Sequence, residues 1–105
     1  MATGTIHDTF ESLNVYLAPS GSLDSIVTRG IWLVETGSSH TDLPEGSNGF
    51  LFVFPSNISG KPWIKQVFLR IGTPGSNDGN IYLRETNNGG TSWGEWWKFT
   101  GTKVT

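Results

Sequence analysis

Apolar and β-branched residues gather in short runs along this chain, and Gly, Asn and Pro separate the runs. This pattern is typical of strands joined by turns. Repeated short strands with such punctuation predict an all-β fold, a small antiparallel sandwich or barrel-like knob. The expected strands are Gly30–Glu35, Gly49–Pro55, Trp63–Gly72, Asn80–Thr86 and Thr91–Phe99.

Two of these segments differ in their pattern. The segment Gly49–Pro55, "GFLFVFP", is apolar throughout. Successive side chains of a strand point to opposite faces, so this pattern predicts that both faces of the strand are covered. The segment Asn80–Thr86 alternates instead, with Ile81 and Leu83 on one face and with Tyr82 and Arg84 on the other face. This alternation predicts a strand with one aliphatic face and one face that carries polar groups.

The connectors carry turn chemistry. Asp78-Gly79 and Asn88-Gly89 are dipeptides that tolerate positive φ in tight hairpin turns. They predict that the last three strands form an antiparallel meander. Asn88-Gly89 is expected to pair the strand Asn80–Thr86 with the start of the final strand.

The N-terminal part of the chain has a different period. In His7–Leu17 the residues Phe10, Leu13 and Leu17 follow a helical spacing, with acidic residues early in the segment. A short N-terminal helical or linker segment is therefore expected.

Composition and charge restrict the function. Only 15% of the 105 residues are charged, the formal net charge is −2, and Gly occurs 14 times. This composition is typical of one turn-rich β domain with a neutral polar surface. No basic stripe exists, so no nucleic-acid partner is expected. No cysteine is present and no apolar run approaches a membrane span, so neither disulfides nor membrane insertion are expected.

Candidate catalytic groups are sparse. A glycosidase needs two carboxyl groups roughly 5 to 9.5 Å apart. Glu85 with Glu95, or Asp42 with Glu45, are the candidate pairs, and nothing in their spacing requires them to converge. The histidines, His7 and His40, show no metal-ligand spacing. We therefore expect no enzyme, no metal site and no cofactor.

The strongest chemical signal is the tryptophan-rich segment near the C-terminus. Trp96 and Trp97 are adjacent, so in a strand they point to opposite faces, and one of them is expected to reach solvent or a partner surface. An exposed indole serves as a platform for a sugar ring or as an anchor in a subunit interface.

Polar and aromatic groups beside this ring define a candidate carbohydrate site. Trp97 and Tyr82 are the expected stacking residues. Hydrogen bonds to sugar hydroxyls are expected from Arg84, Asn87, Asn88 and Glu95. For three of these residues the alternative is a role without a ligand. The two Asn residues would form a turn, and Glu95 would be a solvated surface residue.

The order of four motifs resembles a known family, the knob-type module of bacteriophage tail fibres and R-type pyocin fibres. The resemblance covers roughly residues 13–105. It rests on Gly30, Ile31 and Trp32; on Pro44, Gly46 and Gly49; on Tyr82 and Arg84; and on Trp93 and Trp96. Trp97 departs from the family pattern, which often has Lys or Arg there.

The resemblance implies an all-β knob near the distal end of a homotrimeric fibre, with residues 1–12 connecting it to a shaft. It implies a protein of the virion tail, made in the bacterial cytoplasm, that associates with other fibre proteins and adheres to bacterial surface polysaccharide. Two alternatives remain open. The knob could trimerise or cap the fibre without touching a receptor, or it could be a polysaccharide-degrading enzyme of the tail.

Overall fold

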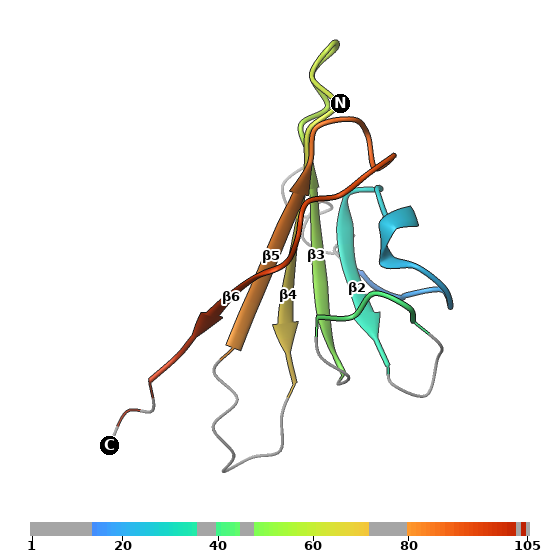
Figure 1. Cartoon of the computed structure of the whole chain (residues 1–105). Coiled ribbons are helices and arrows are strands. Elements are labelled where there is room, and N and C mark those ends of the chain that lie inside the picture. The colour runs from blue at the N-terminus through green and yellow to red at the C-terminus, as the bar shows by residue number, and fades with distance from the viewer. Residues whose placement is uncertain (1–13, 36–39, 45–47, 72–79, 103, 105) are drawn as a thin grey trace, which may run out of the picture.

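The computed structural model describes residues 14–35, 40–44, 48–71, 80–102 and 104. They form one six-stranded sheet in the order β1-β2-β3-β4-β5-β6, which confirms the all-β expectation (Figure 1). β1 pairs parallel to β2, the other neighbours pair antiparallel, and the sheet is not closed into a barrel. The elements are β1 (Val15–Leu17), the 3₁₀ turn η1 (Leu23–Ser25), β2 (Gly30–Val34), β3 (Gly49–Pro55), β4 (Ile64–Arg70), β5 (Asn80–Thr86) and β6 (Trp97–Thr100).

The strands after β1 follow one another as a meander, as the turn chemistry predicted. The prediction for the final strand was wrong in its length, because β6 begins only at Trp97 and pairs there with Leu83. Asn88-Gly89 does form a turn, with a φ of 72° at Gly89, but it does not join the two strands directly. The expected helix was wrong for Val15–Leu17, which is a strand.

Some predictions fall on parts of the chain that are not described. They are the connector at residues 1–12, the first part of the expected helix with His7, the residues Glu45 and Gly46, and the turn at Asp78-Gly79.

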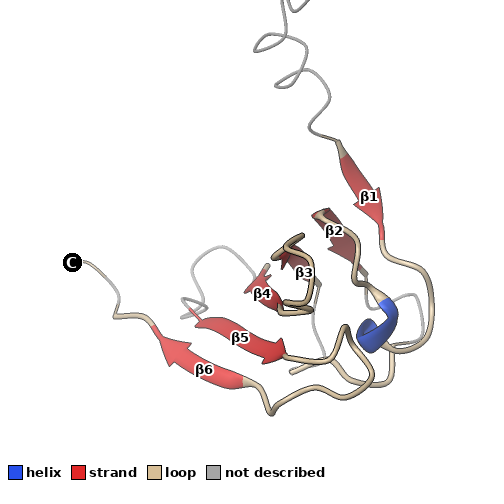
Figure 2. Cartoon of the chain, turned by 90° about the horizontal axis from the view of Figure 1, so that it is seen from above, coloured by secondary structure: helices blue, strands red, loops and turns tan. Residues whose placement is uncertain are grey.

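One face of the sheet, the inner face, carries the core. Phe68, Leu51 and Val34 are fully buried on it, and Leu23 of η1 packs against them. Figure 2 shows η1 and the connector between β5 and β6 on one side of the sheet. A layer of connectors thus covers a layer of strands.

A buried amide ties these two layers together. Gln66 of β4 is fully buried, and its Nε2 donates to the carbonyl groups of Leu23 (2.8 Å) and Ile26 (3.0 Å). The Leu23 carbonyl, which also accepts from the Ile26 N–H (3.1 Å), begins the 3₁₀ turn, and the Ile26 carbonyl follows it. Gln66 therefore bonds to both ends of η1 and fixes it on the sheet.

The opposite face, the outer face, is also largely apolar. The strand register places on it Val15 and Leu17 of β1, Ile31 and Leu33 of β2, Phe50, Phe52 and Phe54 of β3, Val67 and Leu69 of β4, Ile81 and Leu83 of β5, and Trp97 and Phe99 of β6. All of them are partly or substantially exposed, because no described segment of the chain covers this face (Figure 2). The covering of β3 on both faces, predicted from its sequence, is thus found on its inner face only, as far as the described residues go.

Candidate functional site: an aromatic hollow beside the β5–β6 edge

Two of the C-terminal tryptophans, Trp93 and Trp96, turn toward the inner face. Their indole N–H groups donate to the carbonyl oxygens of Asp24 and Asp42, each over 3.1 Å. The guanidinium of Arg84 lies 4.6 Å from the ring centre of Trp93 and 4.5 Å from that of Trp96. A cation between two indoles is a favourable arrangement when it is shielded from water.

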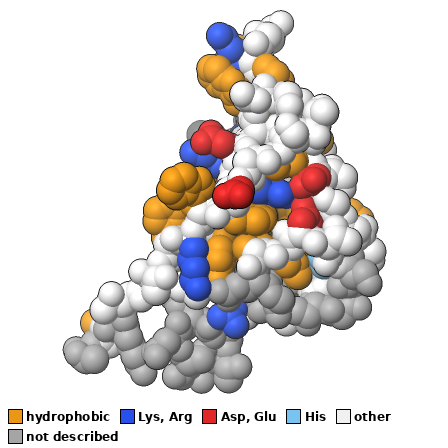
Figure 3. Space-filling view, viewed as in Figure 1, with side chains coloured by type: hydrophobic (Ala, Val, Ile, Leu, Met, Phe, Trp, Pro, Cys, Tyr) orange, Lys and Arg blue, Asp and Glu red, His pale blue; other side chains and the backbone are white. Residues whose placement is uncertain are grey.

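Arg84 is 5% exposed and is held by charged partners on its other sides. Its guanidinium forms ion pairs with Asp24 (2.9 Å) and Asp42 (3.1 Å), and its Nε donates to Gln66 Oε1 (2.8 Å). Acidic and basic atoms lie side by side on this surface of the molecule (Figure 3). The contacts give Arg84 the role of a clamp that holds the connectors on the sheet.

The two aspartates respond in opposite ways. Burial raises the pKa of Asp24, and its side-chain hydrogen bond with Asp42 raises it further. For Asp42, burial is the largest influence and acts upward, but hydrogen bonds from the Leu23 N–H and from Ser22, with the charge of Arg84, outweigh it and lower the pKa. The pKa of Asp42 is therefore shifted toward the ionised form and the pKa of Asp24 away from it, although both carboxylates contact Arg84.

The structure does not bring the predicted stacking pair together. Tyr82 is 3% exposed, because it lies on the inner face among the core residues. Arg84 lies on that same face, whereas Trp97 lies on the outer face in register with Leu83. Tyr82 and Arg84 thus present no surface beside the Trp97 ring. The alternation in β5 had predicted that they share a face, but it did not indicate which face was inside.

Trp97 itself is 68% exposed, so the expectation that one of the two adjacent indoles reaches solvent is confirmed. The reason is local. Trp96 is held inward by its hydrogen bond to the Asp42 carbonyl, and regular strand geometry begins one residue later. Trp97 therefore points to the other side of the sheet.

The remaining predicted residues lie in the connector between β5 and β6. Asn88 builds the turn: its Oδ1 accepts from the Ser92 N–H (3.0 Å) and its Nδ2 donates to Ser92 Oγ (2.8 Å). Asn88 thus has the role in turn formation that was the alternative to sugar binding. Asn87 and Glu95 are exposed. Of the two, Asn87 lines a hollow in the surface.

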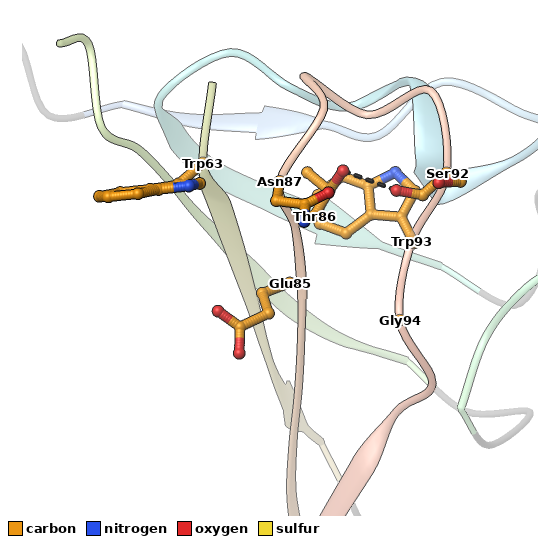
Figure 4. A pocket seen from close by; sticks show the side chains of 7 residues that line it. All are labelled: Trp63, Glu85, Thr86, Asn87, Ser92, Trp93 and Gly94. Carbon is orange, nitrogen blue, oxygen red and sulfur yellow. Dashed lines mark hydrogen bonds between the residues drawn. The ribbon is translucent and has the colours of Figure 1, made fainter. Parts of the chain in front are cut away.

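The hollow has a volume of about 510 Å³, within the range of ligand-binding pockets. Figure 4 shows the Trp63 ring on one side and Trp93 with Ser92 on the other, with Glu85 and Asn87 between them. It is lined by Trp63, Glu85, Thr86, Asn87, Ser92, Trp93 and Gly94. Trp63 is 52% exposed, and Lys61 Nζ stands 5.2 Å from its ring centre.

Trp97 does not line this hollow, but the strand register relates it to one of the lining residues. It is opposite Leu83 in the sheet, and Glu85 is the next residue of β5 on the same face. Diagonal neighbours of this kind lie about 7–8 Å apart. The Gly94 N–H donates to the Glu85 carbonyl (2.9 Å), which fixes the approach of the connector to β5. The exposed indole of Trp63 thus lines the hollow with a carboxylate and an amide, and the register places the exposed indole of Trp97 diagonal to that carboxylate.

Sequence reasoning missed Trp63 and Glu85 as members of this site. Trp63 stood out only as the first residue of an expected strand, and Glu85 only as half of a possible catalytic pair. For Glu85 the signal is the period of two, because Glu85 and Leu83 share the face that carries Trp97. No sequence pattern singles out Trp63.

Metal and membrane signals are weak in the described part of the chain. The described residues contain no group of three or more His, Cys, Asp or Glu side chains that could hold a metal ion. Among the same residues, no helix has the length and apolarity needed to cross a membrane.

Comparison with known proteins finds solved structures with a similar fold. No family model and no curated protein sequence matches the chain. Among solved structures, an N-truncated R2-type pyocin tail fibre matches with a TM-score of 0.63 and 23% identity, over 87% of this chain and 34% of that one. The C-terminal part of the P. aeruginosa R1 pyocin fibre matches with a TM-score of 0.64 and 20% identity, over 87% of this chain and 22% of that one.

This chain therefore spans about a third or less of each of those fibre chains. Its fold is the fold of a module found in R-type pyocin tail fibres. The resemblance seen in the sequence motifs is confirmed at this level.

Proposed function

We propose that this protein is a module of a bacteriophage tail fibre or an R-type pyocin fibre, and that it adheres to bacterial surface glycan without cleaving it. The fold likeness supports the fibre assignment. The observation that supports the adhesion is the presence of two exposed indoles: Trp63, which lines the hollow with its polar groups, and Trp97, which lies diagonal to Glu85 in the strand register.

The chemistry of the hollow suits a sugar. An exposed indole offers a flat apolar surface to the C–H face of a pyranose ring. The Glu85 carboxylate accepts hydrogen bonds from hydroxyl groups, and the Asn87 amide both donates and accepts them. Trp97 and Trp63 are the proposed stacking residues, and Glu85 and Asn87 the proposed hydrogen-bonding residues.

A shallow site of this size binds weakly by itself. We propose that the protein forms a homotrimer within a fibre on the virion tail, together with other fibre proteins. Three linked copies raise the overall affinity through effective concentration, without any new contact. The low charge of the chain fits a neutral ligand that offers little electrostatic steering.

Adhesion is preferred to hydrolysis for a chemical reason. Glycoside hydrolysis uses two carboxyl groups across the scissile bond. Among the residues that line the hollow, only Glu85 carries a carboxyl group. Incubation with polysaccharide followed by an assay for new reducing ends tests this point, and their release would show an enzyme.

The adhesion test compares three variants by calorimetric titration with neutral O-antigen polysaccharide and neutral cell-wall polysaccharide. Trp97→Ala and Trp63→Ala each remove one stacking surface. We expect a loss of affinity of about tenfold or more, since burial of apolar surface contributes roughly 25 cal/mol per Å² and an indole face covers much of a sugar ring. Ile58→Ala, an equally exposed apolar residue in the β3–β4 turn, is the control and should bind as the wild type.

Unchanged affinity in both tryptophan variants would contradict the proposed site. Sedimentation of the same samples shows whether each variant keeps the oligomeric state of the wild type. A variant that loses glycan binding while it keeps its assembly supports adhesion directly.

A further inference from the structure

The outer face of the sheet is an apolar surface without a described cover. Within the six strands it carries two charged residues, Lys65 and Glu85, which are cross-strand partners in the register. Its other side chains are aliphatic or aromatic. Trp97, Leu17, Val15 and Phe99 are each at least half exposed.

The extent of this face is large for a monomer. Strands about 4.8 Å apart, with residues spaced about 3.3 Å along each, give a six-strand face of roughly 500–600 Å² before side-chain relief is counted. This is at the upper end of the range of about 300–600 Å² for the largest apolar patch on a monomer, a patch that is often functional. A standard protein interface buries about 800 Å² on each partner, so this face with its protruding rings approaches that size.

The sequence of β3 also indicates that the outer face is covered by a partner. Every residue of Gly49–Pro55 is apolar, a pattern typical of a strand buried on both faces. Leu51 and Val53 are buried on the inner face, whereas Phe50 and Phe52 are only partly covered and Phe54 is exposed. The chain thus encodes a burial of its outer side chains that its described segments do not supply.

We propose that the outer face packs against further copies of this same chain. The proposal rests on the proposed function, because it names the surface that forms the homotrimer. A second copy fits better than a different partner for two reasons. The face has no unbalanced charge that would select a charged partner, since Lys65 and Glu85 oppose one another. It is also apolar on every strand, so it complements itself.

Trp97 then stands at the boundary of two surfaces. Its strand, β6, is an edge strand, and among the described strands it pairs only with β5. Its ring leaves the outer face next to Glu85 of the hollow, while Phe99 and Ile81 lie further along the same β5–β6 pair. The interface is therefore centred on Phe52, Val67 and Leu83, and the glycan hollow lies at its margin.

The test measures the assembly of the full chain by sedimentation velocity across a wide range of protein concentrations. Phe52→Glu places a carboxylate at the centre of the face, between Ile31 and Val67 in the register. We expect the concentration at half-dissociation to rise roughly a hundredfold or more, because a carboxylate would have to be buried without a partner. The matched control is Ile58→Glu, which makes the same change at an exposed apolar residue outside the face.

A second variant protects the test against misfolding. The double variant Ile81→Glu, Phe99→Glu changes an opposed pair near the open edge, where both side chains are already 41% and 50% exposed in the single chain. Circular dichroism in the aromatic region, which reports the buried environments of Trp93 and Trp96, shows that each variant is folded.

The outcomes separate the two proposals. Folded, monomeric variants of an oligomeric wild type, with an unchanged Ile58→Glu control, are the expected result. An oligomer that both outer-face variants leave intact would overturn the outer-face proposal and leave the homotrimer standing. A monomeric wild type would overturn the outer-face proposal and the homotrimer together, whether the face is bare or is covered by residues 1–13. Glycan binding by that monomer would still support adhesion.

Discussion

The inner and outer faces of this sheet are built from the same strands but are completed in different ways. The inner face includes a buried Arg, Gln and Thr, and the connectors of the chain itself close it. The outer face is more uniformly apolar, and no described segment closes it. The comparison teaches that apolarity alone does not mark the inside of this domain. Polar side chains lie inside where the connectors bring partners for them.

The largest expected effect contrasts two phenylalanines. Phe68 is fully buried on the inner face, so Phe68→Ala removes packing and leaves a cavity; we expect a loss of about 3–5 kcal/mol in the free energy of unfolding. Phe54→Ala on the outer face should cost about 1 kcal/mol or less in the monomer, since that side chain is already half exposed. Urea denaturation of both variants at low protein concentration measures the difference. Equal losses would abolish the distinction between the faces.

A smaller effect is expected from the charged clamp. Arg84→Ala leaves Asp42 without its cation and removes the group between Trp93 and Trp96. Breaking a buried pair costs about 3–5 kcal/mol, and the partial exposure of both aspartates reduces this to about 2–3 kcal/mol.

Two variants serve as references for this measurement in urea. Lys65→Ala, at an exposed position of the outer face, should change stability by less than about 0.5 kcal/mol. Arg84→Lys keeps the charge but loses the planar guanidinium, so it should recover only part of the loss. Full recovery by lysine would show that charge, rather than stacking and forked hydrogen bonds, holds the connectors.

The smallest effect concerns pH. The pKa of Asp42 is lowered in the folded protein from its ordinary value of 3.8, so the unfolded chain binds the proton more readily. The stability that ionised Asp42 contributes is therefore fully present above the unfolded pKa, and it is lost as the pH falls through the lower pKa of the folded protein. Asp24 has a raised pKa and acts in the opposite direction, with a contribution that is lost as the pH rises through its folded pKa.

Asp42→Asn isolates the first of these contributions. We expect the difference in unfolding free energy between wild type and Asp42→Asn to shrink as the pH is lowered from 7 to about 2.5. Urea denaturation at several pH values gives this difference. A constant difference over that range would mean that the Asp42 carboxylate has an ordinary pKa in the folded state.

The sequence predicted most of the strands and the outward indole, because both follow from the period of two. It could not predict which face of β5 lies inside. Ile81 and Leu83 are the more apolar pair, yet Tyr82 and Arg84 are the buried one. The partners that make this possible, Asp24 and Asp42, come from connectors about 40 to 60 residues earlier in the chain. No local pattern encodes such a meeting.

The same long-range contacts explain the length of the final strand. Thr91–Phe99 has strand-like composition, but Trp93 and Trp96 are both drawn to the inner face by Arg84 and by carbonyl groups of distant connectors. Side chains three residues apart cannot share a face in a regular strand. The segment is therefore irregular until Trp97.

The position of Arg84 also has a consequence for how the molecule opens. One guanidinium joins η1 through Asp24, the segment at Asp42, and the connector that carries Trp93 and Trp96. None of these three segments can lift from the sheet without breaking a contact to the same group. Their amide protons should therefore exchange with solvent deuterium at a common rate, as a single cooperative unit, while the isolated turn at Ser59–Gly60 exchanges independently and faster.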